Sequence, residues 1–402
     1  MSQAESTRVF EGLKVLDLTR IVAGPLASQT LADFGARVIK VEKPPFGDEA
    51  RSYTSNYVND VHVSPMFTSL NTGKLSVGID LSKPEGIEVL NRLVAEADVL
   101  IHNFRPDLVR GMSLDYESVS RINKRIVYCS ISGFGGEGIP RGMIAGNDGI
   151  LQAYGGLMSF SGEPGGQFVR CPVPVVDWIT GLNCVIAIMG ALASRAVSGR
   201  GSNIETSLLE GIAGLLSNQI GQYLLNGAIP GPMGSQAPLG QPNQVFATKD
   251  GHVLVATTSD DMFQRCCKIL GASKISSDPR FADSPSRFRN RPALIESFGE
   301  VVSRFTSQEI IELLEGSLVL CSPINNIEQV VQSPQILALE LVQSVGFGDI
   351  ALSVVGPPAR FDGARRQRTS VPIVGENTDE VLMELGYDVD EIDRLRKAEV
   401  VA

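Results

Sequence analysis

The sequence predicts a doubly wound α/β domain with a smaller lobe, and three patterns lead to this prediction. Strand-like and helix-like segments alternate along the first third of the chain, which is typical of a parallel sheet with helices on its faces. A long apolar helix follows at residues 178–197, and a Gly/Pro-rich stretch at residues 227–243 indicates a boundary or an active-site loop. The chain has 402 residues, 43% of them hydrophobic, which is too long for a single compact core to be expected.

The alternation in the first third is regular enough to assign elements. Residues 13–18 and 38–42 read as strands, and a Gly24-Pro25 turn and a helix at residues 26–34 connect them as a β-α-β unit. Ser82-Lys-Pro-Glu85 has the form of a capping box at the start of the next helix. Further strands are expected at residues 75–81, 99–101 and 126–132.

The remaining two thirds combine helices with short strands. Gly199-Arg-Gly201 ends the long apolar helix. A strand at residues 203–206 and an apolar helix to about residue 225 follow. A hairpin is expected at residues 244–248 and 252–257, then helices to about 316, a strand and turn at 317–331, and a final amphipathic helix.

Composition excludes several classes of protein. The formal net charge of −10 disfavours a nucleic-acid partner. The six cysteines contain no C-x-x-C pair and lie in apolar or mixed stretches, which predicts free thiols and a cytoplasmic location. The three histidines are not at metal-ligand spacing, so no metal site is expected. The N-terminus does not resemble a signal peptide, and the apolar helix is interpreted as a core helix rather than a membrane span.

Motifs narrow the chemistry further. The first strand-to-helix turn, Arg20-Ile-Val-Ala-Gly-Pro25, has one glycine, so the dinucleotide-binding fingerprint is absent. A G-x-S-x-G nucleophile elbow is absent as well, which disfavours a serine hydrolase. Asp177 stands between an apolar run and the long apolar helix. From position alone it is either the N-cap of that helix or a nucleophile.

Six segments in order resemble the class III CoA-transferases, the family of formyl-CoA transferase, carnitine CoA-transferase and the α-methylacyl-CoA racemases. The resemblance covers nearly the whole chain. The segments read GLKVLDLTRIVAGPLASQTLADFGARVIKVE, SLNTGKLSVGIDL, HNFRPD, YCSISGFGGEG, VVDWITGLNCVIAIMGAL and GENTDEVL. In the fifth, an Asp precedes a helix of small residues and is followed by Gly four positions later.

The resemblance implies a site and a mechanism. Asp177 matches the family's nucleophile, which forms an aspartyl-CoA thioester; CoA is then a substrate, and no cofactor is bound permanently. The positions implied to bind CoA are Val22, Ala23, Lys43, Asn71, Lys74, Asn103, Phe104, Arg105, Arg110, Ser132, Phe134 and Gly135. Lys40 is an alternative to Lys43, and Phe134 is alternatively a core residue. Some relatives carry Gln at the position of Val22, so here backbone amides must stabilise an oxyanion.

Two departures from the family pattern point to a subfamily. Asn147 stands where the racemases have a catalytic His, and Asn cannot shuttle protons at neutral pH. The glycine run of formyl-CoA transferase is absent from residues 234–240. The resemblance therefore favours transfer from succinyl-CoA or a similar donor to a dicarboxylic acid, with Arg170 or Arg141 near its second carboxylate. The alternatives are an acyl-CoA racemase or isomerase, or a non-catalytic CoA-binding subunit of a heteromeric transferase.

The family fold implies an architecture as well. A Rossmann-like large domain that contains the nucleophile is expected at residues 1–225, and a small α+β domain at 226–325. A C-terminal segment at 326–402 is expected to return to the large domain. Two chains are expected to interlock as an intertwined homodimer, with acyl-CoA and carboxylic acids as substrates.

Overall fold

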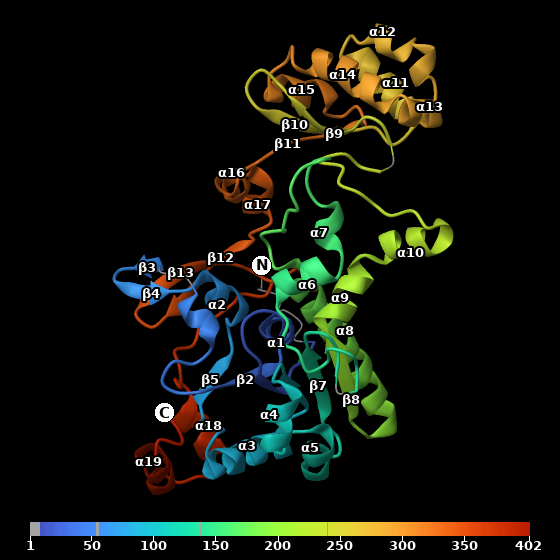
Figure 1. Cartoon of the computed structure of the whole chain (residues 1–402). Helices are drawn as coiled ribbons and strands as arrows, with labels where there is room; N and C mark the ends of the chain where they lie inside the picture. The colour runs from blue at the N-terminus through green and yellow to red at the C-terminus, as the bar shows by residue number, and fades with distance from the viewer. Residues whose placement is uncertain (1–8, 54–55, 137, 239) are drawn as a thin grey trace. The chain divides into compact units, whose positions relative to one another are not determined.

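A six-stranded parallel sheet forms the centre of the larger part of the molecule (Figure 1). Its strand order is β5-β2-β1-β6-β7-β8, the order of a Rossmann sheet, in which the chain builds one half outward from β1 and then crosses to the other side. The predicted α/β fold is confirmed. The strands are β1 (Lys14–Leu18), β2 (Arg37–Glu42), β5 (Leu75–Gly78), β6 (Val99–His102), β7 (Val127–Ser132) and β8 (Ser202–Ser207).

The structure, a computed structural model, describes residues 9–402 except 54, 55, 137 and 239. The chain divides into two compact units. The larger takes the chain as far as Leu157, then Arg170–Ile229 and Gln335–Ala402. The smaller takes Met158–Val169 and Pro230–Pro334.

Helices cover both faces of the parallel sheet. On one face, α1 (Ala23–Asp33) and α8 (Val175–Ser198) pack against each other. On the other, α3 (Pro84–Glu96) and α5 (Tyr116–Ile122) bury a core with the apolar side chains of β1, β2 and β6. Short helices complete the larger unit: η1 (Glu49–Ser52), α2 (Pro65–Leu70), α4 (Pro106–Gly111), α6 (Asp148–Tyr154), α9 (Leu208–Leu215) and α10 (Ser217–Asn226).

The helix α8 differs from its prediction in two ways. It begins at Val175, so Asp177 is its third residue and not the residue before it. By length and mean hydropathy α8 could also cross a membrane. It packs on α1, α9, β7 and β8 as a core helix would, yet Trp178, Leu182 and Ile186 remain exposed along one face.

The C-terminal part of the chain covers the β5 edge of the sheet. The helix α18 (Thr378–Glu384) packs on β5, and Val401 forms a β-bridge with Ile79 after α19 (Val389–Lys397). Two hairpins, not expected from the sequence, belong to the same unit: β3 (Asn56–Val58) with β4 (Val61–Val63), and β12 (Val342–Phe347) with β13 (Ile350–Val355).

The smaller unit is built on a three-stranded antiparallel sheet. Its order is β11-β10-β9, and the predicted hairpin is confirmed as β9 (Asn243–Ala247) and β10 (His252–Ala256), beside β11 (Leu320–Pro323). The helices of this part are α11 (Asp260–Ile269), α12 (Ser273–Ser276), η2 (Pro279–Phe281), α13 (Ser284–Arg289), α14 (Arg291–Val302), α15 (Ser307–Leu314) and α16 (Ile327–Gln332). The short helices α7 (Leu157–Phe160) and α17 (Pro334–Ala338) lie where the chain passes between units.

Candidate active site

The carboxyl ends of β1 and β6 meet at the point where the strand order reverses. In open α/β sheets a ligand binds at this point, because the two chains leave their strands in opposite directions and open a crevice. Here the two loops are joined by reciprocal hydrogen bonds. The Arg20 amide donates to Asn103 Oδ1 (3.1 Å), and Asn103 Nδ2 donates to the Arg20 carbonyl (2.8 Å).

The turn after β1 is held in an unusual conformation. Ile21 has φ of 76°, a left-handed value that is costly for a β-branched residue. Its amide donates to Asp48 Oδ1 (3.1 Å), and Lys40 Nζ bridges Asp48 (2.9 Å) and the Thr19 carbonyl (2.8 Å). This buried support directs the chain into α1, whose first turn has no side-chain cap at Val22. The first amides of α1 therefore remain available as donors.

Asn71 and Lys74, two of the positions implied to bind CoA, lie inside the protein. Lys74 Nζ contacts Asp17 Oδ2 (3.0 Å), Ser28 Oγ (2.8 Å) and Asn71 Oδ1 (2.8 Å), and its side chain is fully buried. Burial lowers the pKa of Lys74 to about 8, although Asp17 opposes this shift. Both side chains are thus engaged in supporting β1, α1 and β5 beneath the crevice.

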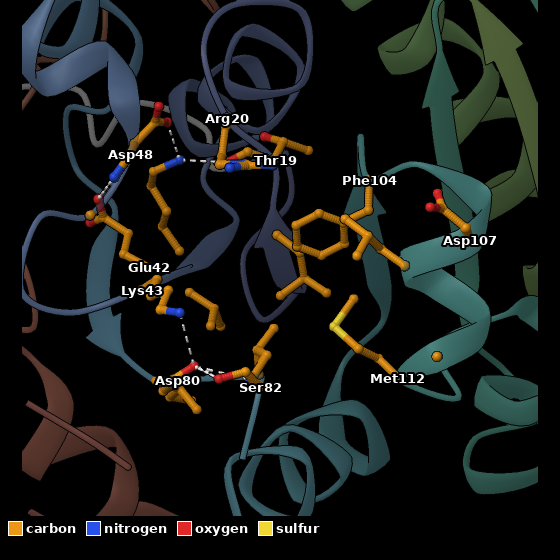
Figure 2. Close-up of a pocket in the computed structure, with 18 residues that line it drawn as sticks. Thr19, Arg20, Glu42, Lys43, Asp48, Asp80, Ser82, Phe104, Asp107 and Met112 are labelled. Atoms are coloured by element: carbon orange, nitrogen blue, oxygen red, sulfur yellow. Dashed lines mark hydrogen bonds and ion pairs between the residues drawn. The ribbon is translucent and has the colours of Figure 1, made fainter. Parts of the chain in front are cut away.

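A first cavity of about 440 Å³ opens beside β1, β2 and β6 (Figure 2). Figure 2 shows Glu42, Lys43 and Asp48 on one side, with Phe104 and Met112 opposite. The Lys43 side chain is 68% exposed and lies 3.5 Å from Asp80. Lys40, the alternative to Lys43, also lines this cavity, but Asp17, Asp48 and Glu42 raise its pKa despite burial and hold it as an internal cation.

A second cavity, of about 180 Å³, contains Asp177. Arg20 and Phe104 line both cavities, so the two meet at these side chains. The implied positions that line the second cavity together with Asp177 are Val22, Ala23, Asn103, Phe104, Arg105 and Ser132.

A third cavity, of about 550 Å³, lies at the ends of β6, β7 and β8. Arg110, Phe134 and Gly135 line this cavity, and Phe104 and Ser132 connect it with the second. Phe134 is 2% exposed and packs edge-on against Tyr154, so the alternative of a core residue also fits it.

The first turn of α8 receives its cap from another helix. Asp148, buried at the start of α6, accepts hydrogen bonds from the amides of Val176 (2.8 Å) and Asp177 (3.4 Å) through Oδ2. Gln152 Nε2 donates to Asp148 Oδ1 (2.6 Å). From its position in the sequence, one of the two alternatives for Asp177 is the N-cap of its helix. That interpretation is wrong, because Asp148 occupies the donors that a cap would use.

The arrangement explains the electrostatics of Asp177. Burial and the nearby Asp148 carboxylate raise the pKa of Asp177 to about 7, and Arg170 opposes the shift. Arg170 Nη2 lies 3.4 Å from Asp148 Oδ1. At neutral pH Asp177 is therefore divided between acid and carboxylate, and its ionised form is about 4 kcal/mol less favourable than that of an ordinary Asp.

Gly181 sets how closely α8 approaches α1. A Cβ at this position would lie 2.6 Å from the Ala23 carbonyl oxygen and 3.0 Å from Leu26. Only glycine allows this contact. Since Gly181 is four residues after Asp177, the close approach brings the Asp177 carboxylate beside the N-terminus of α1, where Val22 and Ala23 line the same cavity.

Sequence reasoning missed three residues that shape the site: Arg20, Asp48 and Asp148. Arg20 begins the first strand-to-helix turn and Asp148 directly follows Asn147, but their contacts are long-range and leave no local pattern. Asp48 lies in the loop after β2, where an acidic residue looks like solvated surface. Asn147 Oδ1 accepts from the Ile150 amide (3.0 Å) as the N-cap of α6.

Comparison with known proteins decides the family. Residues 10–378 match the family described as CoA-transferase family III. The chain belongs to CoA-transferase family III. Two CoA-transferases of similar sequence have names that state their substrates. The succinate–glutarate CoA-transferase of Agrobacterium fabrum is 36% identical over 94% of this chain and 95% of its own length. The human succinyl-CoA:glutarate CoA-transferase is 34% identical over 100% of this chain and 91% of its own length.

Solved structures of family members have the same fold. A CaiB/BaiF family protein from Brucella suis superposes with a TM-score of 0.84 at 35% identity, covering 95% of this chain and 100% of that one. Rv3272 from Mycobacterium tuberculosis gives a TM-score of 0.83 at 28% identity, covering 93% and 99%. The chain is therefore a CoA-transferase whose substrates are CoA thioesters and carboxylic acids.

Proposed function

We propose that the protein moves CoA from an acyl-CoA donor to a carboxylic acid through a covalent aspartyl-CoA thioester on Asp177. The observation that carries the proposal is the position of Asp177. Asp177 lines a cavity at the point where the strand order of the sheet reverses, and its pKa is raised. This cavity adjoins a larger one, which Lys43 lines. An extended ligand with a phosphorylated end and a reactive thioester end suits two cavities joined in this way.

The reaction proceeds by acyl exchange. The Asp177 carboxylate attacks the thioester carbonyl of the donor, which forms a mixed anhydride and releases CoA thiolate. The thiolate attacks the aspartyl carbonyl, which forms the aspartyl-CoA thioester and frees the donor's acid. The acceptor carboxylate attacks this thioester, and the released thiolate then takes the acceptor's acyl group and restores Asp177. Covalent catalysis divides one difficult exchange into easier steps.

The surroundings of Asp177 favour the acylated state. In the thioester the side chain is neutral, so acylation removes the repulsion between Asp177 and the buried Asp148. Val22 and Ala23, at the uncapped N-terminus of α1, line the same cavity, and their backbone amides can donate to the oxyanion of each tetrahedral intermediate. Val22 has no polar side chain for this purpose, so the backbone supplies the donors.

The substrates we propose are succinyl-CoA as donor and a short dicarboxylic acid such as glutarate as acceptor. Support comes from the names of the two similar transferases, which state succinate or succinyl-CoA together with glutarate. Asn147, a helix cap without a titratable group, supports transfer over α-carbon proton exchange.

We also propose that the protein is a homodimer. One face of α8 exposes an apolar stripe formed by Trp178, Leu182, Ile186 and Met189. Ile186 is 67% exposed. The helix α10 exposes a further apolar side chain, Leu224, which is 76% exposed. These exposed apolar side chains support burial against a second copy.

Asp177→Ala tests the proposal. The variant is expected to lose CoA transfer from succinyl-CoA to glutarate completely, because the nucleophile is gone, while CoA binding by calorimetry stays within about threefold of wild type. Asp379→Ala, an exposed acid on α18 far from Asp177 along the chain, is the control and keeps full activity. Transfer by the Asp177 variant at the wild-type rate would refute the mechanism.

A further inference from the structure

The acid-binding part of the site needs a cation, and the two expected arginines do not line the cavity of Asp177. Arg170 is held by Asp148 and packs over Gly149. Arg141 stacks on the rings of Phe134 and Tyr154, 5.1 and 5.2 Å from their centroids. The cations that line the cavity among the described residues are Arg20 and Arg105.

Arg105 is already occupied. It pairs with Asp107, two residues away, through Nε (3.1 Å) and Nη2 (2.9 Å). This bidentate pair uses the fork of the guanidinium that a carboxylate would need. A substrate carboxylate at Arg105 would have only the donors that Asp107 leaves unused, and it would lie beside the Asp107 carboxylate.

Arg20 is differently held. Its backbone is fixed on both sides by Asn103, and its guanidinium lies 5.7 Å from the centre of the Phe104 ring. Its pair with Glu49 is a single contact from Nη1 (2.8 Å), and both side chains are about half exposed. A guanidinium with five donors can bind a further carboxylate beside or in place of such a partner.

Arg20 and Asp177 also share one electrostatic environment. Tyr53, at the end of η1, has its pKa raised by burial and by the carboxylates of Glu49, Asp48 and Asp177, and lowered by Arg20. The guanidinium and the nucleophile therefore both act on one side chain. The Asp177 cavity, of about 180 Å³, has the size of a short acid, and Arg20 lines it together with Asp177.

We propose that Arg20 is the specificity-determining residue that binds the second carboxylate of a dicarboxylic acid while the first reacts at Asp177. The inference rests on the proposed function and adds to it the residue that distinguishes dicarboxylic from monocarboxylic acids. Glu49 is the internal competitor, which holds the guanidinium until the substrate carboxylate arrives.

The test compares glutarate with valerate, which has the same carbon chain without the second carboxylate, using acetyl-CoA and succinyl-CoA as donors. In Arg20→Met, kcat/KM for glutarate is expected to fall about 100-fold, mainly through KM, because the charged hydrogen bonds are lost. The value for valerate is expected to change less than about threefold, since it does not use the guanidinium.

Three further variants complete the test. Arg20→Lys is expected to recover part of the loss. Glu49→Gln is expected to lower KM for glutarate. Arg121→Met, an exposed arginine on α5, is the control and leaves both acids unchanged.

Three outcomes overturn the inference. Equal losses for glutarate and valerate in Arg20→Met would mean that Arg20 serves the common part of the reaction. A large fall in affinity for CoA itself, measured by calorimetry, would assign Arg20 to the CoA phosphates. A wild-type enzyme that transfers CoA to neither acid would refute the proposed function, and the inference with it. The first two outcomes leave the proposed function intact.

Discussion

At the scale of single residues, the site depends on two carboxylates with different roles. Asp148 is buried and accepts hydrogen bonds from the amides of Val176 and Asp177 at the start of α8, while the Asp177 side chain does not use those donors. A carboxylate at a helix N-terminus is normally stabilised as the anion. Here the stabilisation goes to Asp148, and the pKa of Asp177 rises because Asp148 adds repulsion to burial.

The pH dependence of activity tests this pair. Asp177 reacts as the carboxylate, so kcat/KM is expected to rise with pH along a limb centred near 7. Asp148→Asn removes the like charge and is expected to move the limb to lower pH. Arg170→Met removes the opposing charge and is expected to move it to higher pH. At pH 6, a decrease of about one unit from a pKa near 7 raises the ionised fraction of Asp177, and with it the activity, about fivefold. Shifts in the same direction for both variants, measured from pH 5 to 9, would contradict the assignment.

The buried charges under the turn after β1 stabilise the fold beneath the site. Asp17 neutralises Lys74 and Lys40, and although burial opposes ionisation, these lysines hold the pKa of Asp17 far below its usual range. Asp17→Asn leaves two buried ammonium groups undercompensated. It is expected to lower the free energy of unfolding by about 3 to 5 kcal/mol, measured by urea denaturation. A loss below about 1 kcal/mol would mean that the lysines are neutral in the folded protein.

At the scale of secondary structure elements, the crossing of α8 over α1 determines the site. Glycine within a helix usually costs stability relative to alanine. At Gly181 the sign is reversed, because an added Cβ would meet the Ala23 carbonyl oxygen at 2.6 Å. The close packing of α8 on α1 thus explains why the residue four positions after Asp177 is a glycine.

Gly181→Ala tests the crossing. It is expected to lower the free energy of unfolding by about 1 to 3 kcal/mol and to lower kcat, because α8 must move away from α1 and carry Asp177 with it. Gly299→Ala is the control on α14, where the nearest atom to an added Cβ is 3.9 Å away. It is expected to be neutral or stabilising. Equal melting temperatures for Gly181→Ala and wild type would contradict the packing argument.

The elements themselves could largely be predicted from the sequence, but their caps could not. The strands of the parallel sheet, the β9–β10 hairpin and the helix end at Gly199 follow from local patterns, and the structure contains them. Ser82-Lys-Pro-Glu85 has the form of a capping box, yet the Ser82 hydroxyl donates to Asp80 and α3 begins at Pro84 without a side-chain cap. Asp48, Asp148 and the Arg20–Asn103 pair act across 27 to 83 residues of chain. Local periodicity does not contain such contacts.

At the scale of the whole molecule, the larger unit contains the parallel sheet, all three cavities and the exposed face of α8. The family and fold could be predicted from ordered motifs, because these motifs code for the turns at the ends of β1, β6 and β7. The identity of the acid substrate could not be predicted. Which arginine is available to bind a carboxylate depends on the side-chain pairs that form only in the folded protein. Arg141 and Arg170 are the arginines that the sequence suggested, but Arg141 stacks on the Phe134 ring and Arg170 pairs with Asp148.

Oligomeric state is tested at this scale. Ile186→Glu places a charge in the exposed apolar stripe of α8 and is expected to convert the wild-type dimer into monomer in light scattering, because a buried unpaired charge opposes association. Val389→Glu, at an equally apolar exposed site on α19, is the control and is expected to remain dimeric. A wild-type monomer, or an Ile186→Glu dimer, would contradict the proposed interface.

The central claim is that CoA becomes bonded to Asp177. The most direct measurement incubates the enzyme with succinyl-CoA in the absence of an acceptor, treats it with hydroxylamine, and maps the modified peptide by mass spectrometry. The account predicts a hydroxamate at Asp177 that forms only when succinyl-CoA is present. Continued transfer with no modification at Asp177, or with the hydroxamate at another residue, would contradict it.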